Sequence, residues 1–185
     1  MPVDPANLTI AYYPDPILRR RASEVPEVNG EVRAVAARMI ELMFEADGIG
    51  LAAPQVGLSW RLFVAHVPAT DDRSATSDPP TATAEPTVYI NPVLSAPLGD
   101  LVPYEEGCLS LPDIRGDVRR PEHITITATN LKCERFTATA AGLLARCWQH
   151  EADHLDGVLI LDKMSQMSRL KNRSAVRQLE REARD

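Results

Sequence analysis

The sequence is short of several features that define whole classes of protein. Its 185 residues include only three cysteines, an odd number at wide spacing, which argues against a secreted disulfide framework and favours reduced thiols. No run approaches the roughly 18 apolar residues that span a bilayer, and residues 1–10 lack the apolar stretch of a signal peptide. We therefore expect a cytoplasmic protein without a membrane segment.

The chain also lacks an excess of positive charge. Twenty Lys and Arg residues stand against 26 Asp and Glu, which gives a net charge of −6 and a pI near 5.3. Proteins that bind nucleic acid by neutralising phosphates need the opposite balance, so we expect no direct nucleic-acid role. The 44% of hydrophobic and 25% of charged residues are typical of a folded globular protein.

Helical periodicity is clear in two places. Apolar residues recur at helical spacing over 31–44 and again over 141–154, and an Asp-Gly pair ends each pattern. The strand-like runs are shorter: they cover 62–67, 88–90, 123–129 and 158–161, with extended pieces punctuated by Pro92, Pro97 and Pro103. Short strands around two helices predict an α+β fold, and the length of the chain predicts a single domain over 1–185.

Two segments differ from the rest in composition. In residues 68–86 the only apolar side chains besides proline are alanines, so this insert cannot bury enough surface to offset its ordering entropy, and we expect a mobile loop. Residues 165–185 form a polar tail with six Lys and Arg against three acidic residues. The tail is expected to be helical over 167–184, and a solvated helix face is the simpler interpretation of its charge.

The clearest chemical signal is the pattern His150-Glu151-Ala152-Asp153-His154 inside the second predicted helix. Four residues advance a helix by about 400°, so the two imidazoles lie one turn apart on one face and can share a metal ion. Glu151 is placed to act on water beside the metal without serving as a ligand. The pattern predicts a catalytic metal site.

The third metal ligand decides the class of site, because catalytic sites usually take three protein ligands and leave one position open. A longer protease pattern needs a histidine at position 160, where this chain has Ile160, and the nearest downstream glutamates, Glu180 and Glu182, fall in the polar tail. A cysteine is the remaining donor. Cys108 is the best candidate, since Gly107 before it allows a close backbone approach.

A further unusual segment follows the first predicted helix. Residues 48–55, GIGLAAPQ, are small and rich in glycine and alanine, so the backbone there can approach a ligand closely, and Gln55 supplies a neutral amide donor. Taken alone, this segment has a simpler interpretation as a helix C-cap, and a lone cysteine is more often a small buried hydrophobic residue.

Together these segments resemble the signatures of the peptide deformylase family. They read GIGLAAPQ at 48–55, EGCLS at 106–110 and QHEADHLDG at 149–157, in the family's order, and the resemblance covers nearly the whole chain outside 68–86 and the tail. It implies a metal-dependent hydrolase that removes the N-formyl group from formyl-methionine at the N-terminus of newly made polypeptides and releases formate. It also implies short antiparallel and mixed strands packed around a central metal-binding helix.

The resemblance further implies roles for individual residues. Cys108, His150 and His154 would bind the metal, which in this family is Fe²⁺, replaceable by Ni²⁺, Co²⁺ or Zn²⁺; the donor set alone suggests Zn²⁺. Glu151 would be the general base, and Gln55 and the backbone N–H of Leu109 would stabilise the oxyanion. The substrate-binding residues implied are Ile49, Gly50 and Gly107 for the peptide backbone, Glu106, Leu143 and Cys147 for the methionine pocket, and Arg115 for the residues that follow.

Partners and alternatives complete the expectations. The implied partners are formyl-methionyl nascent peptides and, through the tail, a weak contact with the ribosome. Arg146 and Trp148 stand where many relatives carry aliphatic residues, which leaves the rim of the methionine pocket open. Two other functions stay open at this point: another H-E-x-x-H hydrolase such as a peptidase, and a non-catalytic Cys-His₂ metal site. The second would need a closing fourth ligand, for which the candidates are His66, His123, Cys133 and Cys147.

Overall fold

A single five-stranded sheet forms the frame of the molecule. The computed structural model describes residues 3–183, and each strand is antiparallel to its neighbour. The strands, in sheet order and chain order, are β1 (Gly50–Ala52), β2 (Leu62–Ala65), β3 (Thr87–Cys108), β4 (Leu111–Thr129) and β5 (Arg135–Ala141). The one parallel pairing in the described residues is an isolated bridge between Ser23 and Trp60.

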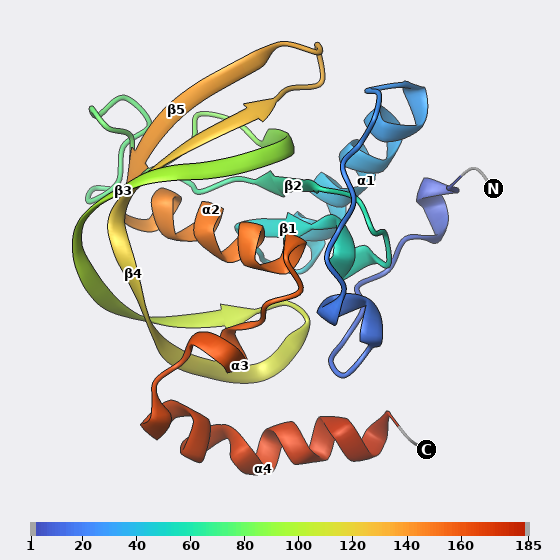
Figure 1. The fold of residues 1–185 in the computed structure, drawn as a ribbon, viewed down its shortest axis with the longest axis vertical. Coiled ribbons are helices and arrows are strands. Elements are labelled where there is room, and N and C mark those ends of the chain that lie inside the picture. Colours follow the sequence, from blue (N-terminus) through green and yellow to red (C-terminus); the bar gives the residue numbers. More distant parts are fainter. Residues whose placement is uncertain (1–2, 184–185) are drawn as a thin grey trace.

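The long strands β3 and β4 curve strongly and wrap around the helix α2 (Gly142–Leu155), as Figure 1 shows. This confirms the α+β fold and the central helix. The two other long helices also lie where the sequence predicts helices: α1 (Gly30–Glu45) and α4 (Gln166–Glu182) match the first helix and the tail, whose residues 184 and 185 lie outside the described part. No helix of residues 3–183 has the length and apolar character needed to cross a membrane.

Two expectations about strands are wrong. Residues 158–161 do not form a strand: the short helix α3 (Ile160–Lys163) begins there, and the Asp162 carboxylate accepts a hydrogen bond from the Leu159 N–H at 2.9 Å. A short apolar run does not distinguish a strand from one buried helical turn. The extended pieces expected between the prolines belong to one continuous strand, β3. Its pairing with β4 changes register at four places, so the strand continues past the prolines.

The insert 68–86 contains no helix or strand beyond one isolated bridge, between Thr70 and Arg73. It is nevertheless tied to the body of the protein. The Thr83 N–H donates to Val67 O at 2.8 Å, Ala82 is buried, and Pro80 O accepts from the Ala141 N–H at 3.0 Å, beside the start of α2. The mobility of the insert stays a prediction.

The position of α2 is fixed from the side opposite the site by an aromatic cluster. Tyr89 on β3 stacks on Phe63 of β2 with ring centroids 4.6 Å apart and meets the edge of Trp148 on α2 at 5.5 Å. All three residues are buried. Burial of such side chains stabilises the fold by about 1.5–3 kcal/mol each, so this face of α2 anchors the helix on the sheet.

Helix α4 packs on β4 next to the segment that carries Arg115. The Asn172 amide donates to Arg115 O at 2.7 Å, and Ser168 Oγ accepts from the Asp117 N–H at 3.0 Å. Between them, Gly116 leaves little room for a side chain, because a Cβ there would lie 3.0 Å from Ser168 Cβ and 3.1 Å from Met164 Cβ. The tail is thus an integral part of the fold over its described residues.

Candidate active site

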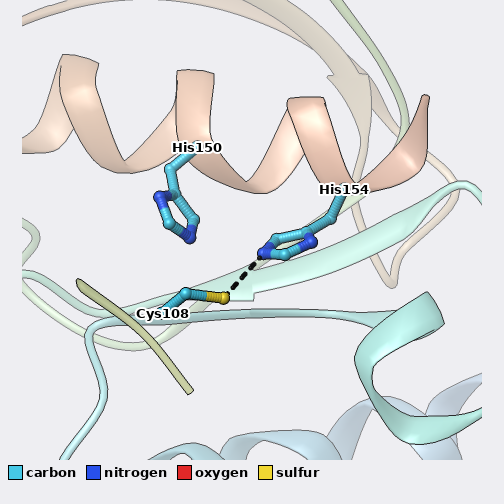
Figure 2. A group of neighbouring side chains, drawn as sticks. All are labelled: Cys108, His150 and His154. Carbon is cyan, nitrogen blue, oxygen red and sulfur yellow. Dashed lines mark hydrogen bonds between the residues drawn. The ribbon is translucent and has the colours of Figure 1, made fainter. Parts of the chain in front are cut away.

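Three potential metal ligands converge where β3 ends against α2. Cys108 is the last residue of β3, and His150 and His154 project toward it from consecutive turns of α2 (Figure 2). Their ligand atoms all lie within 4.8 Å of one another, and Cys108 Sγ is 3.3 Å from His154 Nε2. The structure brings together the ligand set expected from the sequence.

The spacing of these donors fits a metal ion. Two donors bonded to one tetrahedral ion at about 2.0 and 2.3 Å stand roughly 3.5 Å apart. The four candidates for a closing fourth ligand are absent from the only such group found in residues 3–183. Cys147, the one nearest in sequence, instead directs its thiol to Ile49 O at 3.4 Å, and burial raises the pKa of that thiol. The arrangement is that of an open, catalytic type of site.

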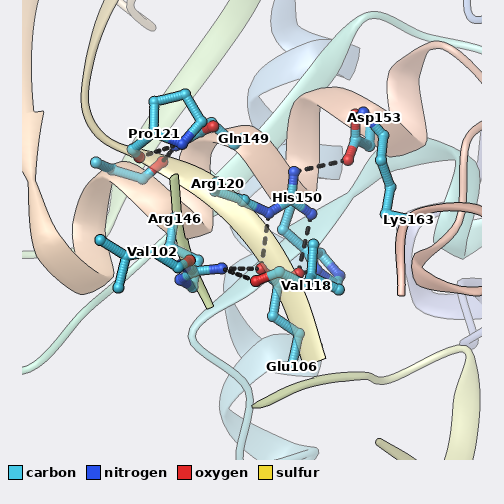
Figure 3. A network of polar contacts seen from close by, with 11 residues as sticks. Val102, Glu106, Val118, Arg120, Pro121, Arg146, Gln149, His150, Asp153 and Lys163 are labelled. Atoms are coloured by element: carbon cyan, nitrogen blue, oxygen red, sulfur yellow. Dashed lines mark hydrogen bonds and ion pairs between the residues drawn. The ribbon is translucent and has the colours of Figure 1, made fainter. Parts of the chain in front are cut away.

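A buried carboxylate orients the first imidazole. Glu106 Oε2 lies 3.1 Å from His150 Nδ1, which keeps the proton on Nδ1 and leaves Nε2 free as a ligand. The same carboxylate accepts two hydrogen bonds from Arg120, at 2.7 and 2.9 Å, and one from Arg146 at 2.7 Å (Figure 3). Glu106 therefore holds the His150 ring in the orientation that a metal ligand needs, and it also lines the cavity.

Both carboxylates of this network are paired with cationic side chains. Arg120 also donates to Asp153 at 2.8 Å, and Lys163 lies 3.4 Å from Asp153 at the surface. Burial would raise the pKa of Glu106, but hydrogen bonds from His150 and Arg120, together with their charges, hold it well below the ordinary value of 4.5. Glu106 is thus a carboxylate throughout the neutral range.

Arg120 and Arg146 were not singled out as site residues from the sequence. A weak signal is present for Arg146 alone, because it falls inside the helix expected over 141–154, next to Cys147; Arg120 precedes the strand expected over 123–129 and has no such signal. The partner itself, Glu106, is distant in sequence from Arg146, so no local pattern connects them.

Glu151 lies beside the ligand group in a tightly enclosed position. A Cβ on Gly50 would stand 2.3 Å from Glu151 Oε1 and 2.9 Å from Cys147 Sγ, so only glycine at position 50 lets β1 approach α2 this closely. Burial raises the pKa of Glu151 to about 7, although the nearby charges of His150 and Arg120 act in the opposite direction. A carboxyl group with a pKa near neutrality can both take up and release a proton.

Gln55 is held so that its amide N–H groups point at the site. Its Oε1 accepts from the Ala52 N–H at 2.8 Å, and its Nε2 lies 3.6 Å from Cys108 Sγ and 3.2 Å from Ser110 Oγ. The backbone contact determines which end of the amide faces the ligand group. A fixed neutral donor in such a place can stabilise a negative charge that develops on a substrate oxygen.

The site opens into a cavity of about 410 Å³. Every other site residue expected from the sequence lines this cavity, whereas His154 is buried behind it. The expected residues that line it are Ile49, Gly50, Gln55, Glu106, Gly107, Cys108, Leu109, Arg115, Leu143, Cys147, His150 and Glu151. Tyr104, Glu105 and Arg146 line it as well.

Because the pKa of Glu106 is low in the folded protein, the free energy of unfolding should depend on pH through this residue. A carboxylate whose pKa is lowered in the folded state stabilises the protein above its unfolded pKa, here near 4.5, and loses that contribution as the pH falls further. We expect Glu106→Gln to lower the free energy of unfolding most at neutral pH, with the difference from wild type shrinking below about pH 4.5. Denaturant unfolding of chelator-treated protein between about pH 7 and about pH 3 measures it.

Glu105→Gln, which removes an exposed carboxylate at the neighbouring position, is the matched control. A difference between wild type and Glu106→Gln that stays constant over the whole pH range would contradict the electrostatic role of Glu106.

Comparison with known proteins agrees with this geometry. Residues 7–170 match the family model described as polypeptide deformylase. The chain is 45% identical over 157 residues to peptide deformylase 2 of Gloeobacter violaceus, covering 85% of this chain and 79% of that protein. It is 42% identical over 177 residues to the peptide deformylase of Acinetobacter baumannii, covering 96% and 94%. The crystal structure of peptide deformylase from Ehrlichia chaffeensis superposes with a TM-score of 0.85 at 32% identity, covering 96% of this chain and 97% of that one. The chain therefore belongs to the peptide deformylase family and is a metal-dependent hydrolase.

Proposed function

We propose that this chain hydrolyses the formamide bond at the N-terminus of formyl-methionyl polypeptides, releasing formate and a free amino group. The observation that carries the proposal is the Cys108–His150–His154 group with Glu151 enclosed beside it, at a cavity lined by all three signature segments. A peptidase with a third His, Asp or Glu ligand has no support here, because the third donor beside the two histidines is a thiol.

The proposed resident metal is Fe²⁺, held by Cys108, His150 and His154, with Ni²⁺, Co²⁺ or Zn²⁺ as substitutes. Support for iron comes from the family resemblance, since a thiolate and two imidazoles also suit Zn²⁺. A divalent ion in this position supplies Lewis acidity, which polarises a carbonyl and makes water a better nucleophile.

The protein's own residues account for the proton transfers. Glu151 takes a proton from the attacking water and passes it to the departing amine as the C–N bond breaks, which suits a carboxyl group with a pKa near 7. The Gln55 amide and the Leu109 N–H donate to the oxygen that becomes negative in the tetrahedral intermediate. Formate and the deformylated peptide with its free α-amino group are the products.

Backbone groups on the two sides of the cavity suit an extended peptide. Ile49 and Gly50 belong to one side and Gly107 to the other, so a substrate strand would be added between them. Leu143 and Cys147 form an apolar wall for the first side chain, next to Glu106. Arg115, which pairs with Gly107 across β3 and β4, is available to the residues that follow.

Glu151→Gln tests the proposed mechanism. We expect near one metal ion per chain and an intact fold, because Glu151 is not in the ligand group, but formate release from formyl-Met-Ala-Ser should fall by about 10²- to 10⁴-fold with the loss of the acid–base group. Formate detection, metal analysis and circular dichroism on the same samples give the three readouts.

Two comparisons accompany this experiment. His154→Ala should lose metal and activity together, since two ligands rarely hold a divalent ion tightly. Acetyl-Met-Ala-Ser should be a far poorer substrate than the formyl peptide for the wild type. Comparable turnover of the two peptides, or an active Glu151→Gln variant, would overturn the proposal.

The choice of iron makes a separate prediction about oxygen. Fe²⁺ and the Cys108 thiolate are both oxidisable, so the activity of protein loaded anaerobically with iron should decay in air or peroxide. Reconstitution with nickel should slow the decay. An air-stable enzyme purified with stoichiometric zinc would show that iron is not the working metal.

We also propose that the protein works in the cytoplasm and reaches nascent chains through a weak ribosome contact by α4. All three cysteines are free thiols in the structure, in agreement with a reducing compartment. The outer face of α4 supports the contact, because it exposes basic side chains while its inner face packs on β4: Lys171, Arg173, Arg177 and Arg181.

Reversal of charge on this face tests the contact. Arg173→Glu combined with Arg177→Glu should weaken co-sedimentation with ribosomes at low salt, because the attraction to phosphates is electrostatic. Formate release from a free peptide should be unchanged. Arg135→Glu, an exposed reversal on β5, is the matched control, and equal co-sedimentation of all three proteins would exclude the contact.

A further inference from the structure

One face of α2 forms a wall of the cavity and includes an unexpected cation. Leu143, Arg146, Cys147 and His150 recur at helical spacing and all line the cavity. Since each residue advances the helix by 1.5 Å, Arg146 stands about 6 Å along the axis from His150. The guanidinium group reaches the Glu106 carboxylate that also contacts His150, so it lies beside the metal ligands and the residues proposed for the methionine pocket.

The guanidinium of Arg146 is fixed on three sides. It donates to Glu106 Oε1 at 2.7 Å, to Val118 O at 3.0 Å and to Val102 O at 2.7 Å (Figure 3). The ring of Tyr104 covers it, with 5.2 Å from the ring centroid to the guanidinium carbon. Arg146 is 8% exposed, so a movement out of this position would leave buried hydrogen-bonding groups without partners.

This geometry makes Arg146 a rigid boundary of the cavity. The side chain crosses from α2 to β3 and β4, with Tyr104 of β3 also lining the cavity next to it. A flexible apolar side chain at this position could yield to a larger ligand, but a guanidinium held by three hydrogen bonds cannot.

We propose that Arg146 is a specificity-determining residue, which closes the pocket for the first substrate side chain and sets the largest side chain accepted. The inference rests on the proposed function, because that side chain belongs to the formylated residue. Methionine, unbranched and flexible, lies along Leu143 and Cys147, whereas a wider side chain meets Arg146 and Tyr104.

Arg146→Leu tests the inference through a ratio of substrates. The readout is kcat/KM for formyl-Phe-Ala-Ser divided by that for formyl-Met-Ala-Ser. We expect the variant to raise this ratio about tenfold over wild type, the scale on which a pocket discriminates by one or two methylene groups. Arg146→Lys, which keeps the charge but loses the planar fork, should raise it less. Arg119→Leu, the same change at an exposed position of β4, should leave it unchanged.

The outcomes separate the possible roles. A purely structural Arg146 would lower kcat/KM for both peptides by the same factor and leave the ratio at its wild-type value, which overturns the inference. The wild type gives a second test that does not depend on folding of a variant: it should use the phenylalanine peptide at least about tenfold less efficiently, and equal use overturns the inference. Wild-type protein that is loaded with metal but releases no formate from the methionine peptide would instead overturn the proposed function.

Discussion

The site depends on one buried carboxylate. Glu106 joins β3, β4 and α2 through its bonds to Arg120, Arg146 and His150. A carboxylate removed from water is costly unless it is fully paired, and here each of its oxygens accepts from two donors. The two arginines compensate the charge, which leaves His150 oriented by a group that cannot itself move. The same interaction holds β3, which carries Cys108, in a fixed position against α2, which carries the two histidines.

The ligands come from rigid elements that are far apart in sequence. Cys108 ends a long strand, and the histidines occupy a helix whose opposite face is anchored by Tyr89 and Trp148. Because β3 and β4 curve around α2, the end of β3 returns to the helix and β1 lies against it (Figure 1). A site built in this way is ordered before any ligand binds, which lowers the cost of assembling it.

The sequence predicted those features that local patterns encode. Helical periodicity located α1 and α2, the polar tail was expected to be helical as α4 is, and the spacing of His150 and His154 within a helix already implied a shared metal. Prediction from the sequence was wrong or silent where contacts between distant segments decide the local structure. Nothing local distinguishes the buried turn of α3 from a strand, joins the proline-punctuated pieces into β3, or pairs Arg146 with Glu106. These follow from contacts between segments that only the folded chain brings together.

The shape of β3 has a consequence for how the protein behaves in a crowded solution. Beyond Ile90, β3 pairs with β4 on one side, and its other edge has no strand partner among the described residues. An open edge of regular N–H and C=O groups is a template on which other chains can add and aggregate. Pro92, Pro97 and Pro103 cannot donate a backbone hydrogen bond, and the register shifts interrupt the repeat of the strand. The irregularity that made β3 hard to recognise in the sequence thus interrupts the edge on which foreign strands could add, outside the cavity where the substrate is proposed to bind.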